Sequence, residues 1–250
     1  MAREYGDNLG IILIESQGAT QTEAEKFAWG KKWMGTSAMW TGERPFNTGA
    51  SGLPNFALLS SEGKVLLMGN PLAMHGQITD AIDAELEKSM NAPEGTPKSL
   101  KKAYATFAKG KYAKSIADIR KVALKGGDGA EDAEALAKAF IARVETKFAR
   151  VDWLLENAYL IEAEDMLSGL IKSTKGLTEV ADKTATLQGT FSAEGMKGQL
   201  KAAKAYAKLE EKLMEEGLDA KLLKKLSKFV DSNSDAKVVK RAKHLISIGS

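Results

Sequence analysis

Few residues of this chain carry side chains that commonly do chemistry. The sequence contains no cysteine and only two histidines, His75 and His244. Without a thiol there can be no disulfide exchange and no cysteine nucleophile. Two histidines also cannot build a histidine-rich metal cluster within one chain. We therefore predict no catalytic residue, no metal ligand set and no cofactor.

Two short strings match the Ser-x-x-Lys pattern of serine acylases, Ser61 with Lys64 and Ser99 with Lys102. The first falls in a turn between two predicted strands, and the second opens a predicted helix, where a serine is more simply a cap. His75 with nearby methionines could suit copper, but an exposed residue at a helix start is the simpler interpretation. These patterns give an enzyme only weak support.

The charge balance excludes an obvious polyanion binder. The chain has 36 basic and 33 acidic residues and a formal net charge of +3. We expect no nucleic-acid partner from this balance, and the lysines at 221, 224, 225 and 228 look like a solvated helix face. No apolar run is long enough for a membrane span, and the first residues lack the apolar stretch of a signal peptide. The localisation is therefore not indicated.

The composition changes near residue 91. Three of the five prolines and three of the four tryptophans precede it, and a stretch rich in Ala, Lys, Leu and Glu without further proline follows Pro97. The Pro, Gly and Asn residues at 91–97 are typical of a linker. We predict an α/β domain at 1–90, a linker at 91–98 and an all-helical domain at 99–250.

The first domain contains short apolar runs separated by helical patterns. Residues 10–15, 55–60 and 64–68 are predicted strands, the last two joined as a hairpin. Residues 23–33 and 75–90 are predicted helices, with Thr20 or Thr22 as a cap for the first. Residues 35–52 look irregular.

Gly52, Leu53 and Pro54 precede an apolar strand, a polar-Gly-Lys turn, a second strand and Gly69. This pattern resembles the second half of a thioredoxin-like domain of the TlpA or thiol-disulfide-interchange type, and the resemblance covers about residues 5–88. It implies a cis Leu53–Pro54 bond and allows a bacterial periplasmic origin. By this resemblance the family's first strand and its Cys-x-x-Cys helix would lie upstream of Met1.

A missing central strand would leave the strands at 10–15 and 55–60 without a neighbour. Unpaired strand edges promote association, so we expect a homo-oligomer formed through the N-terminal segment. A truncated form and direct pairing in a modified sheet are the alternatives.

The second domain is helical throughout. Helices are predicted at 100–108, 112–124, 130–157, 158–173, 178–188, 193–216, 220–231 and 236–248. The segment from Phe107 to Ile116 resembles the turn of a tetratricopeptide helix pair, in which a tyrosine fills the seam. The overall fold class is thus a partial thioredoxin-like α/β segment followed by a TPR-like array of helical hairpins.

Aromatic residues and methionines offer one possible binding surface. The candidates are Trp29, Trp33, Met39, Trp40, Tyr104 and Tyr112. For the residues in and after the first helix, packing over the sheet is the favoured alternative.

Three functions stay open at this point. The leading hypothesis is a non-catalytic scaffold whose helical array binds a protein or peptide partner. The alternative is a truncated remnant of a thiol-disulfide oxidoreductase whose redox motif lies upstream. The third is a hydrolase that uses a serine or a carboxylate.

Overall fold

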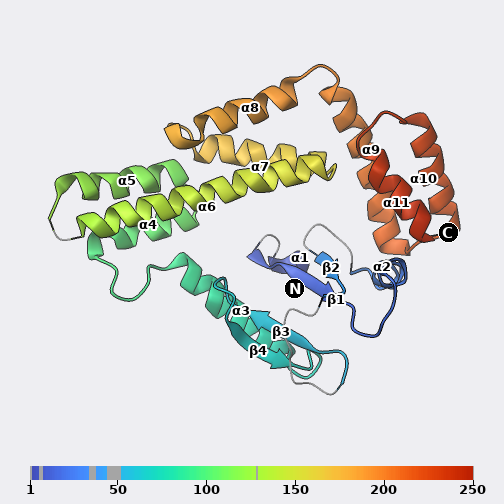
Figure 1. The fold of residues 1–250 in the computed structure, drawn as a ribbon, viewed down its shortest axis with the longest axis horizontal. Coiled ribbons are helices and arrows are strands. Elements are labelled where there is room, and N and C mark those ends of the chain that lie inside the picture. The colour runs from blue at the N-terminus through green and yellow to red at the C-terminus, as the bar shows by residue number, and fades with distance from the viewer. Residues whose placement is uncertain (1, 6–7, 34–37, 44–51, 128, 250) are drawn as a thin grey trace. The chain divides into compact units, whose positions relative to one another are not determined.

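The computed structural model describes residues 2–5, 8–33, 38–43, 52–127 and 129–249. The chain divides into two compact units, Met1–Pro93 and Glu94–Ser250, which we call the α/β unit and the helical unit (Figure 1). The division falls within residues 91–98, the segment that its composition marks as a linker. The described residues show a mixed α/β part followed by an all-helical part, as the sequence predicts at the level of fold class.

The α/β unit contains a strand-helix-strand segment, which follows the short helix α1 (Ala2–Tyr5). Strand β1 (Ile11–Ile14) leads through helix α2 (Gln21–Gly30) to strand β2 (Ala38–Thr41). β1 and β2 pair in parallel along their full length, from Ile11 opposite Ala38 to Ile14 opposite Thr41. Parallel neighbours cannot be joined by a tight turn, so α2 serves as the crossover connection.

Strand β2 corrects two expectations from the sequence. Residues 38–41 are not irregular, because they form a strand against β1. A four-residue strand between Gly35 and Gly42 is too short for its periodicity to stand out from a loop. β1 therefore has a hydrogen-bonded neighbour in its own chain. Each described sheet has only two strands, so the expected homo-oligomer stays a prediction.

A hairpin and a helix complete the α/β unit. Strands β3 (Phe56–Leu59) and β4 (Val65–Gly69) pair antiparallel in a second two-stranded sheet. The Leu53–Pro54 bond just before β3 is cis, as the resemblance implies. Helix α3 (His75–Met90) follows and buries Ile78 and Ile82.

Helix α2 begins with a capping box. The hydroxyl of Thr20 accepts a hydrogen bond from the Glu23 N–H at 3.3 Å, and the Glu23 carboxylate accepts one from the Thr20 N–H at 2.8 Å. These bonds satisfy two backbone donors that the first helical turn would leave unpaired. The bond from the Thr20 backbone also lowers the pKa of Glu23.

Replacing Thr20 with alanine is expected to lower the opening free energy of α2 by about 1 kcal/mol. Native-state hydrogen exchange of the α2 amides measures this, with Thr22→Ala as the control because Thr22 is not the cap. The Glu23 pKa is lowered in the folded chain, so its contribution is present above the unfolded pKa and is lost as the pH falls through the lowered value. An equal effect of the two variants would contradict the assignment.

The helical unit is a succession of antiparallel helices. Its elements are α4 (Lys98–Ala108), α5 (Tyr112–Lys125), α6 (Ala130–Glu156), α7 (Leu160–Ser173), the 3₁₀ turn η2 (Thr178–Val180), α8 (Ala181–Ser192), α9 (Met196–Glu216), α10 (Ala220–Ser232) and α11 (Val239–Gly249). The predicted helix at 178–188 is thus a 3₁₀ turn followed by α8, and the other helices lie where the sequence places them to within a few residues.

Aromatic side chains fill the seam between α4, α5 and α6. The ring of Phe140 lies 4.0 Å from that of Phe107 and 5.2 Å from that of Tyr104, centroid to centroid. Tyr112 packs on Phe107 from the start of α5 at 4.7 Å. The buried Ser115 hydroxyl donates to the Ala103 carbonyl at 2.7 Å, which ties α5 to α4. A tyrosine thus lies in the seam, as the sequence predicts.

A polar junction attaches α11 to the rest of the unit. The Arg241 guanidinium binds both carboxylate oxygens of Glu210 on α9, at 2.6 and 2.7 Å. The Cζ atom of Arg241 lies 3.7 Å from the centre of the Tyr159 ring, just before α7, and 4.9 Å from the centre of the Tyr206 ring. The Tyr206 hydroxyl donates to Glu210 at 2.9 Å, and burial followed by the Glu210 charge raises the pKa of Tyr206. One arginine therefore joins three helical segments.

Candidate binding site

The aromatic residues singled out from the sequence do not form one surface. Trp29 is 5% exposed and belongs to the interior of the α/β unit, which agrees with the favoured packing interpretation and excludes it from a binding surface. Trp33 is 52% exposed and contacts Phe27 edge to face at 5.6 Å. Tyr104 and Tyr112 are half-buried against the core of the helical unit. The side chains of Met39 and Trp40 lie outside the described residues.

The candidate catalytic strings have structural roles or none. The backbone N–H and the hydroxyl of Ser61 donate to Glu85 on α3, and Lys64 forms an exposed ion pair with Glu62 at 2.8 Å. Ser99 and Lys102 are exposed on α4. Among the residues that the structure describes, no cluster of three potential metal ligands occurs. None of the described helices is long and apolar enough to cross a membrane.

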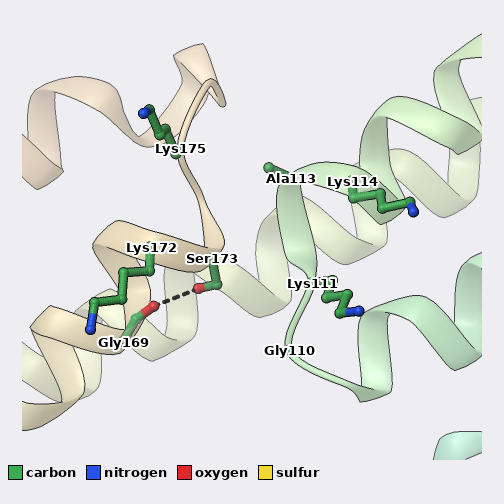
Figure 2. Close-up of a pocket in the computed structure, with 8 residues that line it drawn as sticks. All are labelled: Gly110, Lys111, Ala113, Lys114, Gly169, Lys172, Ser173 and Lys175. Carbon is green, nitrogen blue, oxygen red and sulfur yellow. Dashed lines mark hydrogen bonds between the residues drawn. The ribbon is translucent and has the colours of Figure 1, made fainter.

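The helical unit has a hollow of about 550 Å³ between the start of α5 and the end of α7 (Figure 2). It is lined by Gly110, Lys111, Ala113, Lys114, Gly169, Lys172, Ser173 and Lys175. We call this site the lysine hollow. Half of its lining residues are lysines, and none carries a carboxylate.

Two helix ends position these lysines. Gly110 makes the turn between α4 and α5 with φ at 71°, a left-handed conformation that favours glycine. Lys111 is then the N-cap of α5 and has no side-chain oxygen to accept from the first turn. On the other side, Ser173 donates to the Gly169 carbonyl at 2.9 Å and closes the last turn of α7 (Figure 2). Lys175 follows in the turn after α7 and lines the same hollow (Figure 2).

The four lysines that line the hollow carry positive charge that no ion pair to a described residue compensates. Lys172 suits the negative end of the α7 dipole, but Lys111 and Lys114 lie at the positive end of α5, where a cation is unfavourable. The ammonium groups from the two helices point away from each other (Figure 2), which lowers their repulsion. Helix stability alone thus does not explain the α5 lysines.

Sequence reasoning missed the lysine hollow. The two contributing segments, 110–114 and 169–175, are some sixty residues apart, and each holds only two of the lysines. Packing of successive helices brings such segments together. Counting lysines at equivalent turns of successive hairpins is the signal that could have found the site.

Comparisons with known proteins add no family to this picture. No family model matches the chain, and neither the curated proteins nor the solved structures contain a match. The class that the fold and the site define is therefore stated from the structure: a cysteine-free protein with a small α/β part and a helical part that carries a basic hollow.

Proposed function

We propose that this protein is a non-catalytic interaction protein whose helical unit binds an acidic segment of a partner protein. The observation that carries the proposal is the lysine hollow, with four lysines, no lining carboxylate and no ion pair to the described residues. Opposite charges across an interface speed encounter and select the partner. The ligand class that complements this site is a run of Asp and Glu side chains.

The lining chemistry favours an extended peptide over a small ligand. Small-molecule sites are mostly apolar with a few fixed polar groups. The lysine hollow has Ala113 as its largest apolar lining residue, and its charges stand on long flexible stems. Such stems adapt to carboxylates spread along a chain and do not hold one molecule in a single pose.

Binding of a labelled peptide of Glu and Asp, measured by fluorescence anisotropy, tests this proposal. The variant Lys111→Gln/Lys114→Gln/Lys172→Gln/Lys175→Gln is expected to bind about tenfold or more weakly, because four exposed ion pairs of modest strength are lost together. Raising the salt concentration should weaken binding by the native protein and have little effect on the variant.

A matched variant controls for overall charge. Lys221→Gln/Lys224→Gln/Lys225→Gln/Lys228→Gln removes the same number of exposed lysines from α10, so both variants change the formal net charge from +3 to −1. We expect the α10 variant to keep native affinity. Equal losses in the two variants would mean that the peptide reads only net charge, and the proposal would fail.

For the α/β unit we propose a thioredoxin-like scaffold without redox chemistry. The order β1–α2–β2, then β3–β4–α3, with a cis proline just before β3, supports this assignment. In this arrangement β1 and α2 correspond to the family's first strand and helix. The family's dithiol stands on that helix, and here its start carries the Thr20–Glu23 capping box.

This correspondence weakens the oxidoreductase alternative, and the hydrolase alternative has little support from the structure. The oxidoreductase alternative requires a first strand and a dithiol helix upstream, whereas the proposed correspondence assigns these roles to β1 and α2. Neither a hydroxyl nor a carboxylate can perform thiol exchange. The hydrolase alternative has no support from Ser61, which is bound to Glu85 in a hairpin turn. The scaffold role is therefore the function that the geometry supports best.

A further inference from the structure

Helix α9 carries a line of lysines that the lysine hollow does not explain. Lys197, Lys201, Lys204 and Lys208 follow one another at spacings of four, three and four residues. This spacing keeps them on one helix face, and all four are exposed. The buried residues of α9, among them Tyr206 and Leu213, lie on the opposite face. We call these four residues the α9 lysine stripe.

The stripe opposes the stability of its own helix. Like charges at i,i+3 and i,i+4 repel each other, and the stripe contains three such neighbouring pairs. Cations are also unfavourable near a helix N-terminus, and α9 ends instead on Glu215 and Glu216, where acidic residues are unfavourable. Within the described part of the chain, no ion pair compensates any lysine of the stripe. This leaves the positive charge of the stripe available to a ligand outside the helix.

The neighbouring segment adds to the same charge. The Gln199 side chain donates to the Asp235 carbonyl at 3.1 Å and accepts from the Lys237 N–H at 2.7 Å, which holds the approach to α11 beside the first turns of α9. Residues 193–250 contain 13 basic and 8 acidic residues. The positive excess of this segment is therefore larger than the net charge of +3 for the whole chain. The nearly balanced charge of the whole chain, from which we expect no nucleic-acid partner, hides this local excess of positive charge.

The side chains on the exposed face of α9 indicate which kind of polyanion it can bind. Small residues such as Gly198 and Ala205 lie between the lysines, so this face has no apolar side chain to enter a membrane and none to form the core of a protein interface. It also has no aromatic ring on which an unpaired base could stack. A surface of this kind can bind only through charge, and a duplex backbone offers a dense regular row of phosphates.

We infer that the α9 lysine stripe binds the phosphate backbone of a nucleic-acid duplex without sequence preference. The stripe extends over about 16 Å of helix, and a duplex presents one phosphate charge per about 1.7 Å of its axis. Each lysine can therefore reach its own phosphate. This ligand differs from the acidic peptide of the lysine hollow, so the inference does not depend on the proposed function.

Anisotropy of a labelled DNA duplex of about two helical turns, titrated with the full chain between about 50 and about 200 mM salt, tests the inference. Dissociation constants of about 10⁻⁴ to 10⁻⁶ M are expected for such binding. The variant Lys197→Gln/Lys201→Gln/Lys204→Gln/Lys208→Gln should lose about tenfold or more in affinity at the lower salt concentration. The slope of log affinity against log salt should become shallower by about 3 to 4.

The α10 variant, Lys221→Gln/Lys224→Gln/Lys225→Gln/Lys228→Gln, is the matched control and should stay within about twofold of the native protein, with circular dichroism confirming that both variants fold. The variant of the lysine hollow should also keep duplex binding. Equal losses from α9 and α10, or no binding by the native chain, would overturn the inference. Tighter binding to vesicles with about one third phosphatidylserine, lost in the α9 variant, would assign the stripe to a membrane instead.

Discussion

Replacing Arg241 with alanine is expected to lower the free energy of unfolding of the helical unit by about 3–5 kcal/mol. The side chains of Arg241 and Glu210 are only 16% and 17% exposed. Removing the guanidinium would leave the Glu210 carboxylate without the Nη2 donor that binds both of its oxygens, in a half-buried site. The stacking of Arg241 against Tyr159 and Tyr206 would be lost as well.

Urea unfolding followed by far-ultraviolet circular dichroism measures this loss, because the helical unit supplies most of the helix signal. Arg241→Lys should recover only part of the stability, since a lysine keeps the charge without the planar fork. Lys240→Ala, an exposed neighbour on the same helix, is the control and should change stability by less than about 0.5 kcal/mol. A loss below about 1 kcal/mol for Arg241→Ala would show that the junction does not hold α11 in place.

Replacing Phe140 with alanine is the second change with a large expected effect, about 3–5 kcal/mol. Phe140 is 1% exposed and contacts Phe107 and Tyr104, so its ring links α6 to α4. The loss combines the transfer energy of the ring with the cavity left in a close-packed seam.

The same urea titration measures the Phe140 variant, with Leu124→Ala as its control. Leu124 is 87% exposed at the end of α5, so its truncation should cost less than about 0.5 kcal/mol. A loss of stability that is equal in the two variants would contradict the aromatic seam as the centre of the core. A fall in the slope of unfolding against urea would indicate that the two halves of the helical unit had separated.

Most helices could be predicted because their signals are local. The predicted helix at 112–124 is α5 (Tyr112–Lys125), and that at 220–231 is α10 (Ala220–Ser232). In both, apolar residues recur at the helical period and face the core. The hairpin β3–β4 could be predicted equally well, since its two strands and its turn are adjacent in the sequence.

The errors fall where a residue's role depends on distant neighbours. Strand β2 is too short to be recognised alone, and it is a strand because β1 offers hydrogen bonds to it. The sequence leaves both packing and a surface position open for Trp29, and the structure buries it in the α/β unit. Without β2 the sequence leaves β1 with no partner strand, whereas in the described residues each of the two sheets has two strands and the sheets stay separate.

The sequence by itself determined that this protein has no thiol chemistry, that its composition changes near residue 91, and which face of each helix is apolar. These properties depend on residue type and on spacings of a few residues. Tertiary structure alone decided which strands pair, that Arg241 binds Glu210, and that lysines from α5 and α7 line one hollow. Hydrogen bonds and charge interactions act over a few ångströms, so residues far apart in the chain interact only where packing brings them together.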